Sequence, residues 1–94
     1  MPGVDELILR AIVIQFDGQV VEVFGATSGD GARYHVAFLR EPDIGKSDYK
    51  GRTRVVIGNS SFSVGADEVP RLMRLIAKIS EAIRAAKRQR DGPR

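Results

Sequence analysis

The sequence predicts an α+β fold, in which a curled antiparallel β-meander of about five strands is followed by one long C-terminal amphipathic helix. Two observations support this prediction. Before Asp67, short apolar runs alternate with glycine, proline and polar residues, a pattern typical of strands and turns. From Asp67 to about Arg88, apolar residues recur at intervals of three and four, which places them on one stripe of a helix. The helix is expected to cover an open face or end of the sheet.

The first three expected strands are joined by turns that the sequence specifies. Glu6 to Phe16 is apolar on both faces, which favours a central strand or one that bends between two layers, with a helix as the weaker alternative. Asp17-Gly18 predicts a tight hairpin to a second strand at Gln19 to Phe24. A glycine-rich turn or loop, Gly25 to Gly31, leads to the third strand at Arg33 to Arg40.

The third strand and the segment after it are expected to differ in structure. Within the strand, the apolar side chains of Tyr34, Val36 and Phe38 point to the same face. Glu41 to Gly51 is expected to be a polar loop, because one proline and two glycines interrupt it. This loop is long for so small a chain, and long ordered loops are often functional.

The remaining elements follow with short connections. Two strands are expected at Arg52 to Ile57 and at Ser61 to Val64, and the helix is expected at about residues 67–88. Residues 89–94 form a short basic tail. We expect residues 1–94 to make a single domain, because a chain of this length is large enough for one small core and too short for two.

The helix is expected to be longer than the sheet it covers. Asp67 is expected to cap its N-terminus. A helix of about 22 residues spans about 33 Å, whereas a strand of about seven residues spans about 23 Å. The last two turns would extend past the sheet and leave Ile83 and Ala86 exposed unless something covers them, so we predict self-association, with fraying after Ile83 as the alternative. The candidate self-association residues are Met73, Ile76, Ile83 and Ala86.

Composition limits the class of protein. The 94 residues include no cysteine, which excludes a disulfide framework, a thiolate metal site and a thiol nucleophile. The formal net charge of +3 comes from the basic residues 84–94, so no strongly basic face is expected on the folded body. The longest apolar run is about five residues, against roughly 20 for a membrane span, and the first residues lack the basic segment of a signal peptide. A cytoplasmic protein is therefore expected.

The sequence offers no recognisable catalytic or metal-binding set. His35, the single histidine, is expected in mid-strand without a partner for acid–base chemistry. The spacing of Asp43 and Asp48 matches no calcium loop. Gly25 to Gly31 is rich in glycine, but it is not followed by the helix that a phosphate loop requires. We predict no catalytic residue, no metal site and no cofactor, and we expect neither enzymatic activity nor a small-molecule substrate.

Basic residues gather around the expected polar loop and the fourth strand. Arg52 and Arg54 alternate along that strand, so both side chains are expected on one face. Tyr49 adds an aromatic surface, and cations beside an aromatic ring bind single-stranded nucleic acid or anionic head groups. A solvated strand face and loop is the alternative, because acidic residues dilute the positive charge. The candidate contact residues for an anion or a nucleic acid are Arg40, Lys46, Tyr49, Lys50, Arg52 and Arg54.

The final unit, RTRVVIGNSSFSVGADEVPRLMRLIAKISEAI, resembles the closing part of small bacterial PH-like domains. In those domains a last strand leads through a short turn into a C-terminal amphipathic helix that caps a curled antiparallel sheet. By this resemblance, Phe62 to Val64 is the last strand and Asp67 to Ile83 is the capping helix. PH-like domains have seven strands, whereas the sequence indicates five. The outline is also similar to the PC4-type coactivator fold, a curved four-stranded sheet followed by a helix that dimerises, which implies binding of single strands through basic strand faces.

The predicted function follows from these observations. We expect a small non-enzymatic binding module of PH-like type that acts through a protein partner or as a homodimer. The alternative is a protein that binds nucleic acid, single-stranded or regulatory DNA, through the basic strand and loop residues and the basic C-terminal tail. Added salt distinguishes the two, because it weakens phosphate contacts steeply and leaves an apolar helix interface intact.

Overall fold

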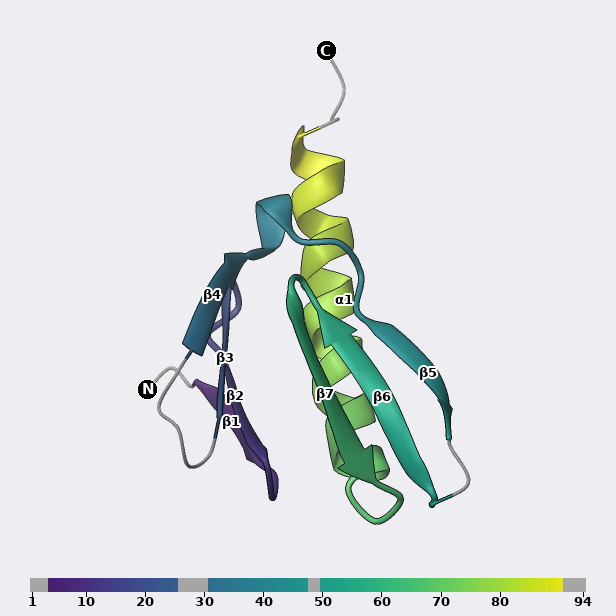
Figure 1. The fold of residues 1–94 in the computed structure, drawn as a ribbon. Coiled ribbons are helices and arrows are strands. Elements are labelled where there is room, and N and C mark those ends of the chain that lie inside the picture. The colour runs from purple at the N-terminus through teal and green to yellow at the C-terminus, as the bar shows by residue number, and fades with distance from the viewer. Residues whose placement is uncertain (1–3, 26–30, 48–49, 91–94) are drawn as a thin grey trace.

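The computed structural model describes residues 4–25, 31–47 and 50–90, and these residues form two antiparallel sheets and two helical segments (Figure 1). One sheet has the order β1 (Asp5–Ile8), β2 (Ile12–Phe16), β3 (Val20–Gly25), β4 (Gly31–His35). The other has the order β5 (Asp43–Ser47), β6 (Arg52–Ile57), β7 (Ser60–Gly65). A short 3₁₀ helix, η1 (Val36–Phe38), follows β4, and the long helix α1 (Val69–Arg90) follows β7. The predicted α+β class is confirmed, although the described residues contain seven strands instead of about five.

Alternate residues of the four-stranded sheet form its buried face. Leu7, Ile14 and Val23 lie side by side across β1, β2 and β3, and all three are buried. Phe16 pairs with Val21 one step along the same face, and both are buried as well. Successive side chains of a strand point to opposite faces, so this alternation alone directs the apolar residues inward.

The three-stranded sheet follows the same rule. On its inner face, Val55 of β6 pairs with Ile44 of β5 and with Phe62 of β7. Val55 is fully buried, and its two neighbours pack partly buried against the core. Arg52 and Arg54 occupy the alternate positions of β6 and are exposed on its outer face. The strand therefore has one apolar face and one basic face.

Helix α1 completes the core between the two sheets. In Figure 1 it runs beside both sheets and continues past them toward the C-terminus. Its buried residues recur at intervals of three and four and join the same core cluster as the inner faces of both sheets. These residues are Leu72, Leu75, Ile76, Ile79 and Ile83. Within the part of the chain that the structure describes, no helix combines the length and apolar character needed to cross a membrane.

Tyr34 joins the last strand of the first sheet to the hairpin of the second. Its hydroxyl lies 2.7 Å from Ser60 Oγ and accepts the Asn59 N–H at 3.1 Å. The ring lies directly against Gly58, which has φ of 59° in the turn between β6 and β7. A side chain at position 58 would collide with the ring and would also strain the backbone, so glycine is required there.

The prediction of a single strand from Glu6 to Phe16 is wrong. The segment forms β1 and β2, which pair with each other around a turn in which the Leu9 N–H donates to the Ile12 carbonyl at 2.9 Å. The turn contains no glycine or proline, and Leu9 is buried within it. The turn is held instead by the distant residue Glu68, which accepts the Arg10 N–H at 2.8 Å.

The predicted third strand and the loop after it also need correction. The strand expected at residues 33–40 ends at His35, and the chain turns into η1. The His35 Nδ1 atom accepts the Ala37 N–H at 3.1 Å, which fixes this turn. The polar segment expected to be a loop, residues 41–51, contains β5, which pairs with β6 through an irregular register. The sequence does not indicate β5 as a strand, because Ile44 is its one apolar residue that packs against the core.

The last two strands and the helix lie close to their predicted positions, and the helix runs from Val69 to Arg90. The predicted cap at Asp67 is wrong. The Glu68 carbonyl accepts the Leu72 N–H at 3.1 Å, and the Asp67 carboxylate is bonded to Arg10 instead. The glycine-rich segment and the last part of the basic tail lie largely outside the described residues.

Candidate functional site

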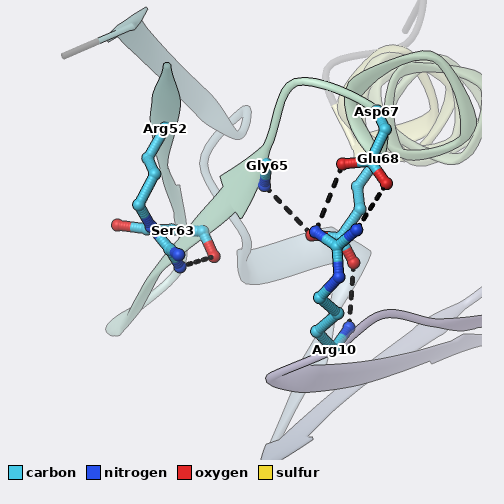
Figure 2. Close-up of polar contacts among 6 residues, drawn as sticks. All are labelled: Arg10, Arg52, Ser63, Gly65, Asp67 and Glu68. Carbon is cyan, nitrogen blue, oxygen red and sulfur yellow. Dashed lines mark hydrogen bonds and ion pairs between the residues drawn. The ribbon is translucent and has the colours of Figure 1, made fainter. Parts of the chain in front are cut away.

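The structure divides the predicted basic cluster between two places. Arg52 and Arg54 share the outer face of β6, as predicted, beside the small residues of β7. The Arg52 Nη2 atom donates to the Ser63 carbonyl at 3.4 Å (Figure 2). Lys46 and Lys50 are also exposed in this half of the chain. Arg40 instead lines a groove with residues of η1 and α1, and Tyr49 lies outside the described residues.

The predicted self-association residues do not form one exposed surface. Met73 is 41% exposed, but Ile76 and Ile83 are buried, at 6% and 7%. Ala86 is partly buried and packs against the core. The expectation that Ile83 would be exposed beyond the sheet is wrong, because η1 packs against this part of α1. Of the four, Met73 offers the largest exposed apolar side chain.

Phe38 is the residue that sequence reasoning missed. It lies on η1 and is 87% exposed, more than any other large apolar residue among those the structure describes. The sequence places it on the same face as Tyr34 and Val36, as in a strand. The 3₁₀ turn changes the period from two to three, so Val36 and Leu39 are buried and Phe38 points away from the core. A cap provided by a histidine side chain leaves no common sequence signal for this turn.

Phe38 lies between two open grooves. The first, which we call the alanine groove, has a volume of about 990 Å³ and lies between η1, the β2–β3 turn and the last turns of α1. Its lining includes Gln19, Ala82, Ala85, Ala86 and Arg88. The second, which we call the basic groove, has a volume of about 460 Å³ and lies between η1, the residues that follow it and α1. Its lining includes Arg40, Glu41, Ile83, Arg84 and Lys87.

The charges around these grooves are unequal. Arg84 is shared between Glu41 and Glu81, at 3.4 Å from each carboxylate, and Arg88 lies 3.3 Å from Glu81. Arg40 and Lys87 line the basic groove without an ion-pair partner among the described residues. The surface around Phe38 therefore carries a surplus of positive charge.

A second polar cluster lies at the N-terminal end of α1, where Glu68 is buried and its neighbours Arg10 and Asp67 are exposed (Figure 2). The Glu68 side chain accepts the Arg10 N–H at 2.8 Å and the Gly65 N–H at 3.0 Å, so it bonds the backbone of both sheets. The Arg10 guanidinium also lies 2.6 Å from the Asp67 carboxylate. Because each oxygen of the buried Glu68 carboxylate accepts a backbone N–H, this side chain links the two sheets.

The pKa values of this cluster follow from its contacts. Burial is the strongest single influence on Glu68 and by itself raises its pKa. The two backbone N–H donors and the charge of Arg10 together outweigh burial, so the pKa of Glu68 lies below its ordinary value. The hydrogen bond from Arg10 is the main cause of the lowered pKa of Asp67. Both carboxylates are therefore stabilised in their charged form.

Other chemistry has little support in the described part of the chain. No group of three histidine, aspartate or glutamate side chains among those residues lies close enough to hold a metal ion. His35 lies with its ring centroid 6.1 Å from that of Phe38, and its Nδ1 atom is used by the Ala37 N–H. Two exposed surfaces of the described residues remain as candidates for binding, the surface of η1 around Phe38 and the outer face of β6 with Arg52 and Arg54.

Comparison of the chain with protein-family models, with curated proteins and with solved structures gives no match.

Proposed function

We propose that this chain is a small non-enzymatic interaction module of PH-like type, which binds a protein partner or a second copy of itself. The observation that carries this proposal is Phe38, an aromatic side chain 87% exposed between two grooves. Aromatic residues are enriched at protein interfaces, where they supply much of the binding free energy. A large apolar side chain that contributes so little to the core has its most direct explanation in a contact with another molecule.

The arrangement of strands supports the PH-like part of this proposal. The sequence indicated five strands, two fewer than PH-like domains have. The described residues contain seven strands in two antiparallel sheets, followed by one C-terminal helix packed into the core between them. The described strands therefore equal in number those of PH-like domains, whereas the strands expected from the sequence were two fewer. A cytoplasmic location remains part of the proposal, in agreement with the absence of cysteine.

The second candidate function is binding of nucleic acid. The specific observation in its favour is the outer face of β6, where Arg52 and Arg54 are exposed beside the small side chains of Ser61 and Ser63. Small neighbours leave a phosphate backbone free to approach both guanidinium groups. The described part of this face lacks an aromatic ring on which bases stack, which makes it the weaker of the two candidates.

Light scattering tests the two candidates together. The mass of the protein is measured at low and high salt, over a range of concentrations, with and without a single-stranded oligonucleotide. An interaction module that self-associates shows a mass that rises with concentration and persists in high salt, and Phe38→Ser or Met73→Ser lowers it. A mass that rises only with oligonucleotide, and only at low salt, would replace the proposal with the second candidate.

A further inference from the structure

We infer that the surface around Phe38 binds an acidic peptide segment of a partner protein, anchored by one large apolar side chain. This inference rests on the proposed function and adds the chemistry of the partner. It uses three features that the structure brings together: the exposed ring of Phe38, the alanine groove beside it and the surplus of cations around the basic groove.

The alanine groove provides the place for the apolar anchor. Ala82, Ala85 and Ala86 line it from α1, and the Phe38 side chain borders it from η1. Alanine side chains leave room above the helix, so an aromatic or long aliphatic side chain can lie there and cover one face of the Phe38 ring. Burying two large apolar side chains against each other is the usual centre of a small protein interface.

The cations around the basic groove favour acidic residues beside the apolar anchor of the partner. Arg40 and Lys87 have no ion-pair partner in the described part of the chain, and both line the basic groove that shares Phe38 with the alanine groove. Arg84 and Arg88 are balanced by Glu41 and Glu81, so the surplus of positive charge is that of Arg40 and Lys87. A segment with carboxylates on one or both sides of its anchor is complementary to this surface, and complementary charge favours encounter and register.

Two other occupants fit this surface less well. A second copy bound around a two-fold axis would bring the same surplus of positive charge against itself. A single strand of nucleic acid would meet the carboxylates of Glu41 and Glu81, and the alanine groove offers its bases no ring beyond Phe38 and His35. The acidic peptide satisfies both the apolar and the charged part of the surface.

Amide chemical-shift titration of the ¹⁵N-labelled full chain tests the inference. The probe is a nine-residue peptide with a central tryptophan flanked by aspartate and glutamate. One control peptide replaces the acidic residues with lysine and arginine, and another replaces the tryptophan with serine. We expect the acidic tryptophan peptide to bind at least about tenfold more tightly than either control. The shifts should centre on residues 36–39 and 82–88.

Matched variants locate the site. Phe38→Ser and Lys87→Glu should each raise the dissociation constant of the acidic peptide about five- to tenfold. Ile8→Ser, at an exposed apolar position of β1, and Arg74→Glu, nearer the other end of α1, should change it less than about twofold. All four side chains are exposed, and the amide spectrum of each variant reports whether it is folded.

Each remaining outcome overturns the inference. Equal affinity for the basic peptide, or shifts that do not depend on Phe38 and Lys87, would remove the assigned site. A twelve-nucleotide single strand that binds residues 36–39 more tightly than the acidic peptide would assign the surface to nucleic acid. Absence of peptide binding together with self-association that Phe38→Ser abolishes would refute the acidic partner and leave the proposed function standing. Absence of both peptide binding and self-association would refute both.

Discussion

The side chains gathered around the two ends of α1 differ in what they contact. At the N-terminal end, buried Glu68 accepts one backbone N–H from each sheet, from Arg10 at 2.8 Å and from Gly65 at 3.0 Å. At the C-terminal end, Phe38 is 87% exposed, and a groove beside it is lined by Arg40 and Lys87, which have no ion-pair partner among the residues that the structure describes. One end has its polar groups satisfied within the fold, and the other leaves apolar surface and charge in contact with water.

By this difference, the N-terminal end of α1 contributes to stability, and the C-terminal end carries the surface proposed to bind a partner. A buried carboxylate that bonds two backbone donors is costly to disturb, because its loss leaves those donors without a partner. An exposed aromatic ring contributes little to the free energy of unfolding, but it leaves most of its apolar area available for contact with a partner. We therefore expect substitutions at the N-terminal end to reduce stability and substitutions at the C-terminal end to reduce binding.

The largest expected effect compares the buried apolar residues of the two ends. Leu72→Ala should lower the free energy of unfolding by about 3–5 kcal/mol, because Leu72 is 1% exposed in the closed core. Ile83→Ala should cost less, about 2–3 kcal/mol, because Ile83 borders the basic groove and its surroundings can relax or admit water. Urea unfolding measures both. A larger cost for Ile83→Ala would contradict the comparison.

The next effect concerns the carboxylate itself. Glu68→Gln keeps the size of the side chain, but its NH₂ group would face one of the two N–H donors from Arg10 and Gly65. We expect the free energy of unfolding to fall by about 1–3 kcal/mol. Glu81→Gln, at the exposed C-terminal end, is the matched control and should cost no more than about 0.5 kcal/mol. An equal loss of unfolding free energy in Glu68→Gln and Glu81→Gln would contradict the greater structural role of the carboxylate at the N-terminal end.

The pH dependence of stability follows from the same cluster. A carboxyl group with a lowered pKa in the folded chain adds stability that is present above its unfolded pKa and is lost as the pH falls through its folded pKa. The ordinary values are 3.8 for Asp67 and 4.5 for Glu68, and both are lowered in the folded chain. The free energy of unfolding should therefore decrease as the pH falls below 4.5.

Urea unfolding at a series of pH values from neutral to acidic measures this decrease. Glu68→Gln should make the curve shallower. A smaller slope should remain from Asp67 and from Asp17, whose pKa is lowered by the backbone N–H groups of Val20 and Gln19. An unchanged slope in the variant would mean that Glu68 does not contribute through its charge.

The smallest expected effect on stability is at Phe38. Phe38→Ser should change the free energy of unfolding by no more than about 0.5 kcal/mol, because the ring buries little area in the fold. The same variant should lose most of its binding to a partner. Thermal unfolding monitored by circular dichroism measures the first quantity. A cost above about 1 kcal/mol would mean that the ring supports η1, and the assignment of this residue to binding would weaken.

The sequence predicted those parts of the fold that depend on local periodicity. The stripe of Leu72, Ile76 and Ile79 identified α1, and the alternation of Arg52 and Arg54 with Val55 identified the basic face of β6. Both patterns arise within one element and need no knowledge of its neighbours. The expected cover of the sheet by the C-terminal helix followed from the same reasoning.

The features that depend on distant residues could not be predicted in the same way. The turn at Arg10 contains no turn-forming residue and is held by Glu68, 58 positions later. The exposure of Phe38 results from a 3₁₀ turn capped by His35, within a run that has the alternation of a strand. For the candidate site, the sequence identified Arg40 as a contact residue but not its neighbours Phe38 and Lys87, because residues from η1 and α1 meet only in the folded chain.

Amide hydrogen exchange of the native protein measures the difference between the two ends most directly. The Arg10 and Gly65 amides, which donate to buried Glu68, should exchange at least about a hundredfold more slowly, relative to their intrinsic rates, than the Ala37 and Leu39 amides in and beside η1. Glu68→Gln should remove most of that difference. Equal protection at both ends, or slower exchange at η1, would contradict the account.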